Sequence, residues 1–118
     1  MFELMTESSF SAAHQLRGYN GPCENLHGHT FKVQLFVNGS DTGNTGMVLD
    51  FKEMKRSLAE AISDLDHSNL NELEEFKSQN PTAENLARLI FTRISGKIKV
   101  SRVTVWESPT ACATYLEK

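Results

Sequence analysis

The chain has 118 residues, with 12 Lys and Arg against 15 Asp and Glu and a formal net charge of −3. Its length suits one domain, 1–118, and its acidic balance gives no general attraction to nucleic acid or to an anionic membrane, so neither is expected as a partner. It holds no run of ~20 apolar residues and no start typical of a signal peptide, and two cysteines are too few for a disulfide-stapled secreted fold. We therefore expect a cytoplasmic protein.

Two strands are predicted in the N-terminal third. The first shows an imperfect alternation, carried by residues of one parity: Phe2, Leu4, Phe10 and Ala12. A loop rich in turn residues follows at 17–25, and a second strand then alternates cleanly, with these apolar positions: Phe31, Val33, Leu35 and Val37. A period of two is typical of a strand that buries one face. Turn formers at 38–46 connect this strand onward.

The period then changes to about 3.6, which predicts helices. Asp50 followed by Glu53 resembles a capping box, and the first helix is expected over 51–66, with this apolar stripe: Phe51, Met54, Leu58, Ile62 and Leu65. A second helix is expected from a cap at Thr82 or Asn80 to Gly96.

Two further strands are predicted at the C-terminal end. One runs over 98–106 with a phase slip near Ser101, and the other over 111–116. Cys112 falls inside this last apolar strand and is expected to be a buried thiol. The order ββααββ favours an antiparallel sheet with two helices on one face, an α+β architecture.

Three histidines are candidate metal ligands. His27 and His29 lie two residues apart at the start of the second strand, so in an extended chain both project from the face that carries Phe31. His14 ends the first strand, and the loop between the strands is long enough to bring it beside the other two. Three neutral imidazoles suit zinc before other ions and leave a fourth position open, as in catalytic sites. The alternative is a turn with surface histidines.

Other reactive side chains allow two interpretations each. Asp66 and His67 stand where the apolar stripe stops, and they could form a proton shuttle or simply end a helix. Glu107, at a strand end, could bind a ligand or be solvated. Cys23 taken alone is a small loop residue or a buried thiol, and Glu24 alone is a solvated carboxylate.

Six segments in order, spread over nearly the whole chain, resemble the 6-pyruvoyltetrahydropterin synthase and 6-carboxytetrahydropterin synthase family. They are "FSAAH" (10–14), Cys-x-x-x-His-Gly-His (23–29), "GMVLDF" (46–51), "LDHSNLN" (65–71), "NPTAENLA" (80–87) and "VWES" (105–108). The resemblance implies the tunnelling fold, in which trimers close their sheets into a barrel and commonly stack into hexamers with active sites at subunit interfaces.

The resemblance also implies residue roles. One zinc ion per subunit would be held by His14, His27 and His29. Cys23 would be the catalytic proton acceptor, Asp66 and His67 would form a proton relay, and Glu107 would anchor the pterin ring.

The substrate that the resemblance implies is 7,8-dihydroneopterin triphosphate. The short chain is similar to the bacterial branch that makes 6-carboxy-5,6,7,8-tetrahydropterin, with acetaldehyde and triphosphate, for queuosine and other 7-deazaguanines. One alternative is the pyruvoyl branch, which eliminates triphosphate. Another rests on Glu24 beside Cys23, since a glutamate in this loop is typical of members that release 6-hydroxymethyl-7,8-dihydropterin for folate. A non-enzymatic alternative is a zinc-dependent pterin-binding module.

Overall fold

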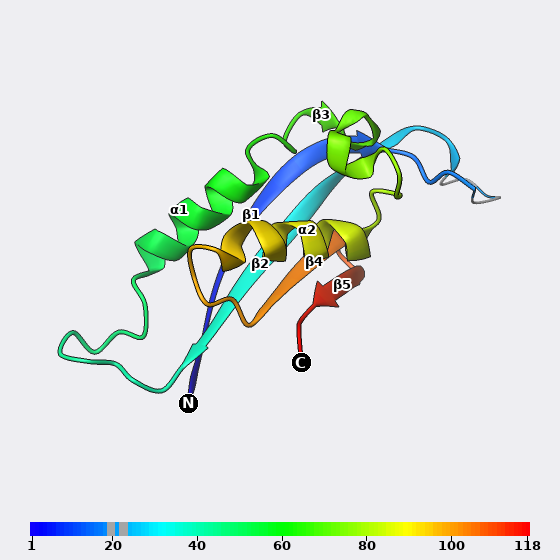
Figure 1. Ribbon diagram of the computed structural model, residues 1–118. Coiled ribbons are helices and arrows are strands. Elements are labelled where there is room, and N and C mark those ends of the chain that lie inside the picture. The colour runs from blue at the N-terminus through cyan, green and yellow to red at the C-terminus, as the bar shows by residue number, and fades with distance from the viewer. Residues whose placement is uncertain (19–20, 22–23) are drawn as a thin grey trace.

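The computed structural model describes residues 1–18, 21 and 24–118. Its five strands lie in the order β3-β1-β2-β4-β5, and both α-helices cover one face of this sheet (Figure 1). The strands are β1 (Phe2–His14), β2 (His27–Gly39), β3 (Ser68–Asn69), β4 (Arg102–Ser108) and β5 (Ala111–Tyr115). The helices are α1 (Phe51–Ile62), α2 (Ala83–Ser95) and the short 3₁₀ helices η2 (Leu70–Glu72) and η3 (Glu74–Phe76). This is the expected α+β architecture.

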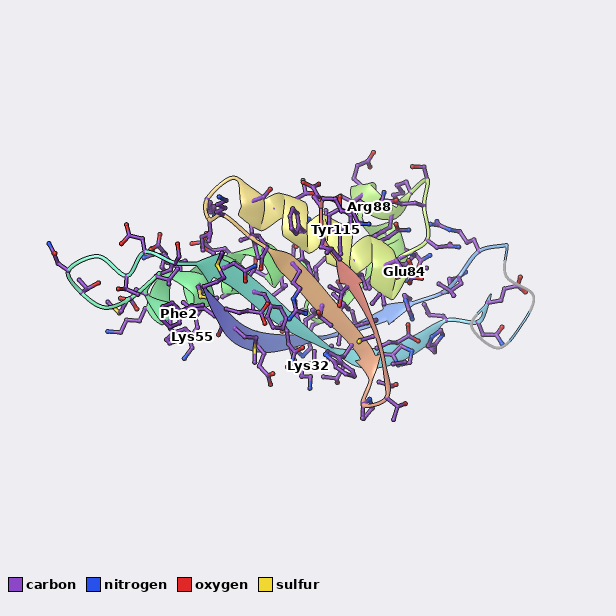
Figure 2. All side chains as sticks on the ribbon, turned by 90° about the horizontal axis from the view of Figure 1, so that it is seen from below. Phe2, Lys32, Lys55, Glu84, Arg88 and Tyr115 are labelled. Carbon is purple, nitrogen blue, oxygen red and sulfur yellow. The ribbon has the colours of Figure 1, made fainter. Side chains whose placement is uncertain are left out.

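The antiparallel pair of β1 and β2 forms the long axis of the sheet. Its register runs from Phe2 opposite Gly39 to His14 opposite His27. The predicted alternation of β2 is confirmed, because its residues of one parity are buried beneath the helices: Phe31, Val33, Leu35 and Val37. The other parity is more polar, and Lys32 lies on the side of the sheet away from α2 (Figure 2).

Both helices begin at the predicted caps. The Asp50 carboxylate accepts a hydrogen bond of 2.9 Å from the backbone N–H of Lys52, and the Thr82 hydroxyl accepts one of 3.1 Å from that of Asn85. Each bond satisfies a backbone donor that the first helical turn leaves free. The cap at Thr82 also fixes the segment just before α2, which lies beside the end of β1.

The prediction that the first helix runs to residue 66 is wrong, because α1 ends at Ile62. After it the chain turns, with the N–H of Leu65 bonded to the carbonyl of Ile62, and the Asp66 carboxylate then accepts a bond from the N–H of Ser11 in β1. β3 follows and pairs in parallel with Ala12–Ala13. The sheet is therefore mixed and five-stranded, and the expected sheet of four antiparallel strands is corrected.

The strand expected over 98–106 begins later, at Arg102. The N–H of Ile98 bonds to the carbonyl of Ile94, so this buried side chain still belongs to the turn that ends α2. Ser101 then donates its N–H to the carbonyl of Phe36 at 2.9 Å, which brings the chain to the edge of β2. Ile98 and Val100, which precede β4, therefore pack on the core without pairing with β2.

Within the described ranges, no helix combines the length and the apolar composition that are needed to cross a bilayer.

Candidate metal centre

Three histidines meet where β1 ends and β2 begins. The register places His14 opposite His27, and His29 follows on the same face of β2. The ring centroids are 4.6 Å apart for His14 and His27, 4.8 Å for His27 and His29, and 5.2 Å for His14 and His29. One ring nitrogen from each residue lies within 4.8 Å of the other two, so the side chains are positioned to bind one metal ion. The meeting predicted from the strand pattern is confirmed.

Backbone carbonyls orient two of the rings. Nδ1 of His14 lies 2.8 Å from the carbonyl oxygen of Pro81, and Nδ1 of His27 lies 2.7 Å from that of Asn25. A carbonyl can only accept, so both Nδ1 atoms carry the proton and donate it. The Nε2 lone pairs are then left for a metal, which is the arrangement that holds histidine ligands in known metal sites.

The environment of the cluster also fits a metal ion. The Nε2 atoms of His14 and His29 are buried and have no hydrogen-bond partner in the described part of the chain. A buried polar atom without a partner is costly, and a bound cation would relieve that cost. Burial lowers the pKa of His14, which favours the neutral imidazole that a metal requires. Three imidazole nitrogen donors are compatible with zinc.

Glu107 lies beside this cluster. Because Trp106 pairs with Lys32 in an antiparallel register, Glu107 lies opposite Phe31 and points to the same face of the sheet. The Glu107 Oε1 atom is 3.4 Å from Nε2 of His29, an ion-pair distance without hydrogen-bond geometry. A half-buried carboxylate therefore lies beside the histidine cluster, and its binding of a ligand stays a prediction.

A small pocket of about 210 Å³ adjoins Glu107 at the start of α2. Its lining consists of Ala83, Glu84, Glu107, Ala111, Cys112 and Ala113. The expectation that Cys112 is buried is wrong: the thiol is free and exposed, because β5 is the edge strand of the sheet and its outer flank is uncovered.

Asp66 and His67 form a separate pair in the turn between α1 and β3. The Asp66 Oδ1 atom accepts the Ser11 N–H at 2.9 Å, and its Oδ2 lies 3.0 Å from Nδ1 of His67. The bond from Ser11, and secondarily His67, lowers the pKa of Asp66 below its usual range. His67 has a left-handed backbone with φ of 57° and a side chain that is 84% exposed. A fixed carboxylate thus orients an accessible imidazole.

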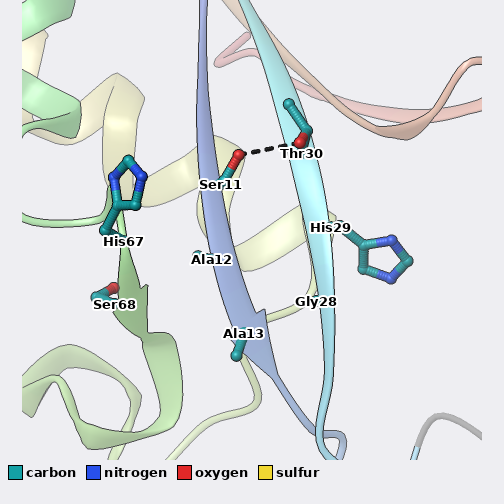
Figure 3. A pocket seen from close by; sticks show the side chains of 8 residues that line it. All are labelled: Ser11, Ala12, Ala13, Gly28, His29, Thr30, His67 and Ser68. Carbon is teal, nitrogen blue, oxygen red and sulfur yellow. Dashed lines mark hydrogen bonds between the residues drawn. The ribbon is translucent and has the colours of Figure 1, made fainter.

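Figure 3 shows His67 and His29 on opposite sides of the β1–β2 pair. Both line an open pocket of about 450 Å³, whose other lining residues are Ser11, Ala12, Ala13, Gly28, Thr30 and Ser68. Within the described residues, no hydrogen bond or ion pair links Asp66 or His67 to the three histidines.

The remaining candidates lie in the loop between β1 and β2. Cys23 is outside the described residues. Glu24 is exposed, and its backbone N–H bonds to the carbonyl of Gly21 at 3.0 Å. Sequence reasoning missed the carbonyls of Asn25 and Pro81 that orient the histidines, because every residue has a carbonyl and only the folded chain shows which one a ring meets.

Comparisons with known proteins agree on one family. A family model described as 6-pyruvoyl tetrahydropterin synthase matches residues 3–118. A 6-carboxy-5,6,7,8-tetrahydropterin synthase from Haemophilus influenzae is 33% identical, over 99% of this chain and 100% of that protein. A dihydroneopterin monophosphate aldolase from Pyrococcus furiosus is 36% identical, over 88% of each chain. The solved structure of Caenorhabditis elegans 6-pyruvoyl tetrahydropterin synthase superposes with a TM-score of 0.90 at 28% identity, covering 99% of this chain and 96% of that one.

Proposed function

The chain belongs to the 6-pyruvoyl tetrahydropterin synthase family, and on this premise we propose that it is a zinc-dependent 6-carboxy-5,6,7,8-tetrahydropterin synthase. This lyase would convert 7,8-dihydroneopterin triphosphate and water into 6-carboxytetrahydropterin, acetaldehyde and triphosphate, as a step toward queuosine and other 7-deazaguanines. The observation that carries the proposal is the cluster of three histidines, positioned to bind one metal ion, beside a carboxylate. The Haemophilus relative, similar over its whole length, supports the choice of product.

His14, His27 and His29 would hold the zinc ion through Nε2. Hydrogen bonds to backbone carbonyls orient the rings of His14 and His27, and burial lowers the pKa of His14. Three protein ligands leave a position for substrate, where zinc would supply Lewis acidity toward the side-chain hydroxyls.

Glu107 would select and orient the pterin ring. An ionised carboxylate can accept two hydrogen bonds, and the 2-amino-4-oxo pyrimidine edge of a pterin offers two neighbouring N–H donors. Because Glu107 lies 3.4 Å from His29, a ring held by this carboxylate would lie beside the histidine cluster, with its C6 substituent one ring length away from the carboxylate. Positioning of this kind lowers the entropic part of the barrier.

Proton transfers would fall to Cys23, as a thiolate, and to His67, held by Asp66. His67 lies across the β1–β2 pair from His29 of its own chain (Figure 3), and within the described residues no hydrogen bond or ion pair links the Asp66–His67 pair to the three histidines. We therefore propose that a neighbouring copy supplies this pair, which makes the active enzyme a homo-oligomer, a trimer or a hexamer.

Free strand edges fit such an assembly. Within the described residues, β1 pairs with β3 only at Ala12 and Ala13, and β5 pairs on one side only. Closing several sheets into one barrel would cover these edges, which otherwise invite uncontrolled pairing.

A second candidate function is side-chain cleavage to 6-hydroxymethyl-7,8-dihydropterin. Glu24 directly follows Cys23, so the loop offers two alternative bases, and one relative bears the name dihydroneopterin monophosphate aldolase. In the proposed main reaction, Cys23→Ala abolishes the carboxy product, whereas formation of any hydroxymethyl product requires Glu24.

The deciding experiment incubates zinc-loaded protein anaerobically with 7,8-dihydroneopterin triphosphate and, in parallel, with unphosphorylated dihydroneopterin, and resolves the pterins by liquid chromatography and mass spectrometry. 6-Carboxytetrahydropterin together with acetaldehyde is the expected result. A pyruvoyl product would place the chain in the biopterin branch, and a hydroxymethyl product would favour the second candidate. Folded, zinc-loaded protein without turnover would instead be a pterin-binding module.

A further inference from the structure

A second open pocket, of about 300 Å³, lies between the chain that leaves β1 and the chain that precedes α2. Its lining consists of Arg17, Lys77, Ser78, Gln79 and Asn80. None of these residues has a role in the function proposed above. Their chemistry, two cations with hydroxyl and amide groups, is that of an anion-binding surface.

The guanidinium of Arg17 is held in place by the pocket wall. Its Nη2 donates to the carbonyl of Phe76 and, at 2.7 Å, to that of Gln79. Asn80 closes the arrangement: its side-chain oxygen accepts the backbone N–H of Arg17 at 2.8 Å, and its Nδ2 donates to the carbonyl of Arg17 at 2.9 Å. Because Nη1 makes no hydrogen bond with the described residues, a fixed cationic donor remains for a ligand.

The charge in this pocket is not neutralised. Arg17 and Lys77 form no ion pair with any carboxylate of the described residues. The pocket between α1 and α2 also holds two cations, but there Arg93 pairs with Asp64 and Lys97 pairs with Glu60. In a chain with a net charge of −3, a pocket whose charged lining is only positive attracts an anion.

The position of the pocket relates the anion to the metal centre. Arg17 follows His14 by three residues, and at most about 10 Å of chain separates their Cα atoms. On the facing segment, Asn80 binds Arg17 while the next residue, Pro81, binds His14. The adjacent residues Asn80 and Pro81 thus contact the cationic pocket and the histidine cluster, respectively. A ligand bound at the histidines can therefore extend into the pocket.

We propose that Arg17 and Lys77 bind the polyphosphate tail of the substrate, with the Ser78 hydroxyl as a further donor. This inference rests on the proposed function for the identity of the ligand, a phosphate ester whose other end lies at the metal centre. Phosphate oxygens accept charge-assisted hydrogen bonds from guanidinium and ammonium groups, and Arg17 is already oriented to donate them. The pocket would then favour the triphosphate over unphosphorylated dihydroneopterin.

The test compares Lys77→Glu with Lys55→Glu. Both lysines are exposed and both changes alter the charge equally, but Lys55 lies on α1 at a distance from the pocket (Figure 2). Titration calorimetry measures the binding of inorganic triphosphate, kept as its magnesium complex, to the full-length zinc-loaded protein, and metal analysis confirms that zinc is retained. Lys77→Glu is expected to weaken binding about tenfold or more, and Lys55→Glu less than about twofold.

Kinetics add a second readout. Lys77→Glu should lower kcat/KM for 7,8-dihydroneopterin triphosphate through KM, whereas the Kd of unphosphorylated dihydroneopterin, which lacks the triphosphate and is measured by calorimetry, should not change. Arg17→Lys should retain part of the preference for the triphosphate. Equal effects of Lys77→Glu and Lys55→Glu, or no binding of triphosphate by the parent, would overturn the proposal. Binding that depends on Lys77 without any turnover would refute the proposed function alone, whereas product formation that is indifferent to Lys77 would refute only this inference.

Discussion

The Nδ1 atom of His14 lies 2.8 Å from the carbonyl oxygen of Pro81, a residue 67 positions later in the chain. This contact joins the last residue of β1 to the segment that caps α2, and it fixes which ring nitrogen of His14 stays free. The capping of α2 at Thr82 holds that carbonyl in place. The geometry of the histidine cluster therefore depends on packing between the sheet and the helix layer, as well as on the two strands that carry the three histidines.

His14→Ala should abolish stable zinc binding. Loss of an outer-shell partner costs about 10–100-fold in metal affinity, and loss of a ligand should cost more. Zinc measured by elemental analysis after gel filtration should fall from one ion per chain to near zero.

The matched control is His67→Ala, which removes an imidazole away from the cluster. It should retain zinc while losing turnover. Equal zinc loss in both variants would contradict the assignment of His14 as a ligand and of His67 as a proton carrier.

Glu107→Gln should impair substrate recognition more than metal binding. Glutamine keeps the size of the side chain but replaces one acceptor oxygen by a donor, which opposes the N–H edge of a pterin. Hydrogen bonds to charged groups contribute about 1.5–3 kcal/mol, so kcat/KM should fall roughly 10- to 100-fold. Steady-state kinetics together with zinc analysis checks this, and a variant with parental kinetics would exclude Glu107 as the pterin anchor.

Local patterns predicted β2, which carries two of the three histidines, and the start of α1. Alternation from Phe31 to Val37 identified β2 and therefore the common face of His27 and His29, and the cap at Asp50 identified the start of α1. These features depend on neighbours in sequence, which is why a single chain reveals them. The family resemblance covered the same segments, and the comparisons confirm it.

Features that depend on contacts between residues far apart in the sequence could not be predicted from local patterns. β3 has two residues, too few for a period, and it exists because it pairs with Ala12 and Ala13. Leu65 continues the apolar helical stripe in sequence, yet it lies in a turn after α1. Its side chain is buried because the hydrogen bond between Ser11 and Asp66 holds this turn against β1. Tertiary hydrogen bonds overrode the local pattern at both places.

Phe31→Ala should destabilise the fold strongly. The ring is fully buried and stacks on Phe10 with centroids 5.0 Å apart. It also packs edge-to-face with the rings of His14 and His29, at centroid distances of 5.4 and 5.6 Å. The cavity should lower the free energy of unfolding by about 3–5 kcal/mol. Phe2→Ala is the control, since that ring is 55% exposed and its loss should cost within about 0.5 kcal/mol. Urea unfolding separates the two, and similar costs would contradict the described core.

Asp66→Asn should lower the free energy of unfolding above about pH 4 and have less effect in stronger acid. The folded chain lowers the pKa of Asp66, first through the N–H of Ser11 and then through His67, so the ionised carboxylate favours the folded state. That contribution is fully present above the unfolded pKa of about 3.9, and it is lost as the pH falls through the lower folded value.

Asparagine can still accept the Ser11 N–H, so the variant isolates the charge. Urea unfolding of parent and variant, both with a chelator so that zinc release does not contribute, should show a lower free energy of unfolding for the variant at pH 5.5. This difference should narrow below about pH 4, as protonation removes the same charge from the parent. If the difference in the free energy of unfolding persisted undiminished in strong acid, Asp66 would stabilise the fold through packing. The hydrogen bond from Ser11 to its ionised carboxylate would then not be the cause of the stabilisation.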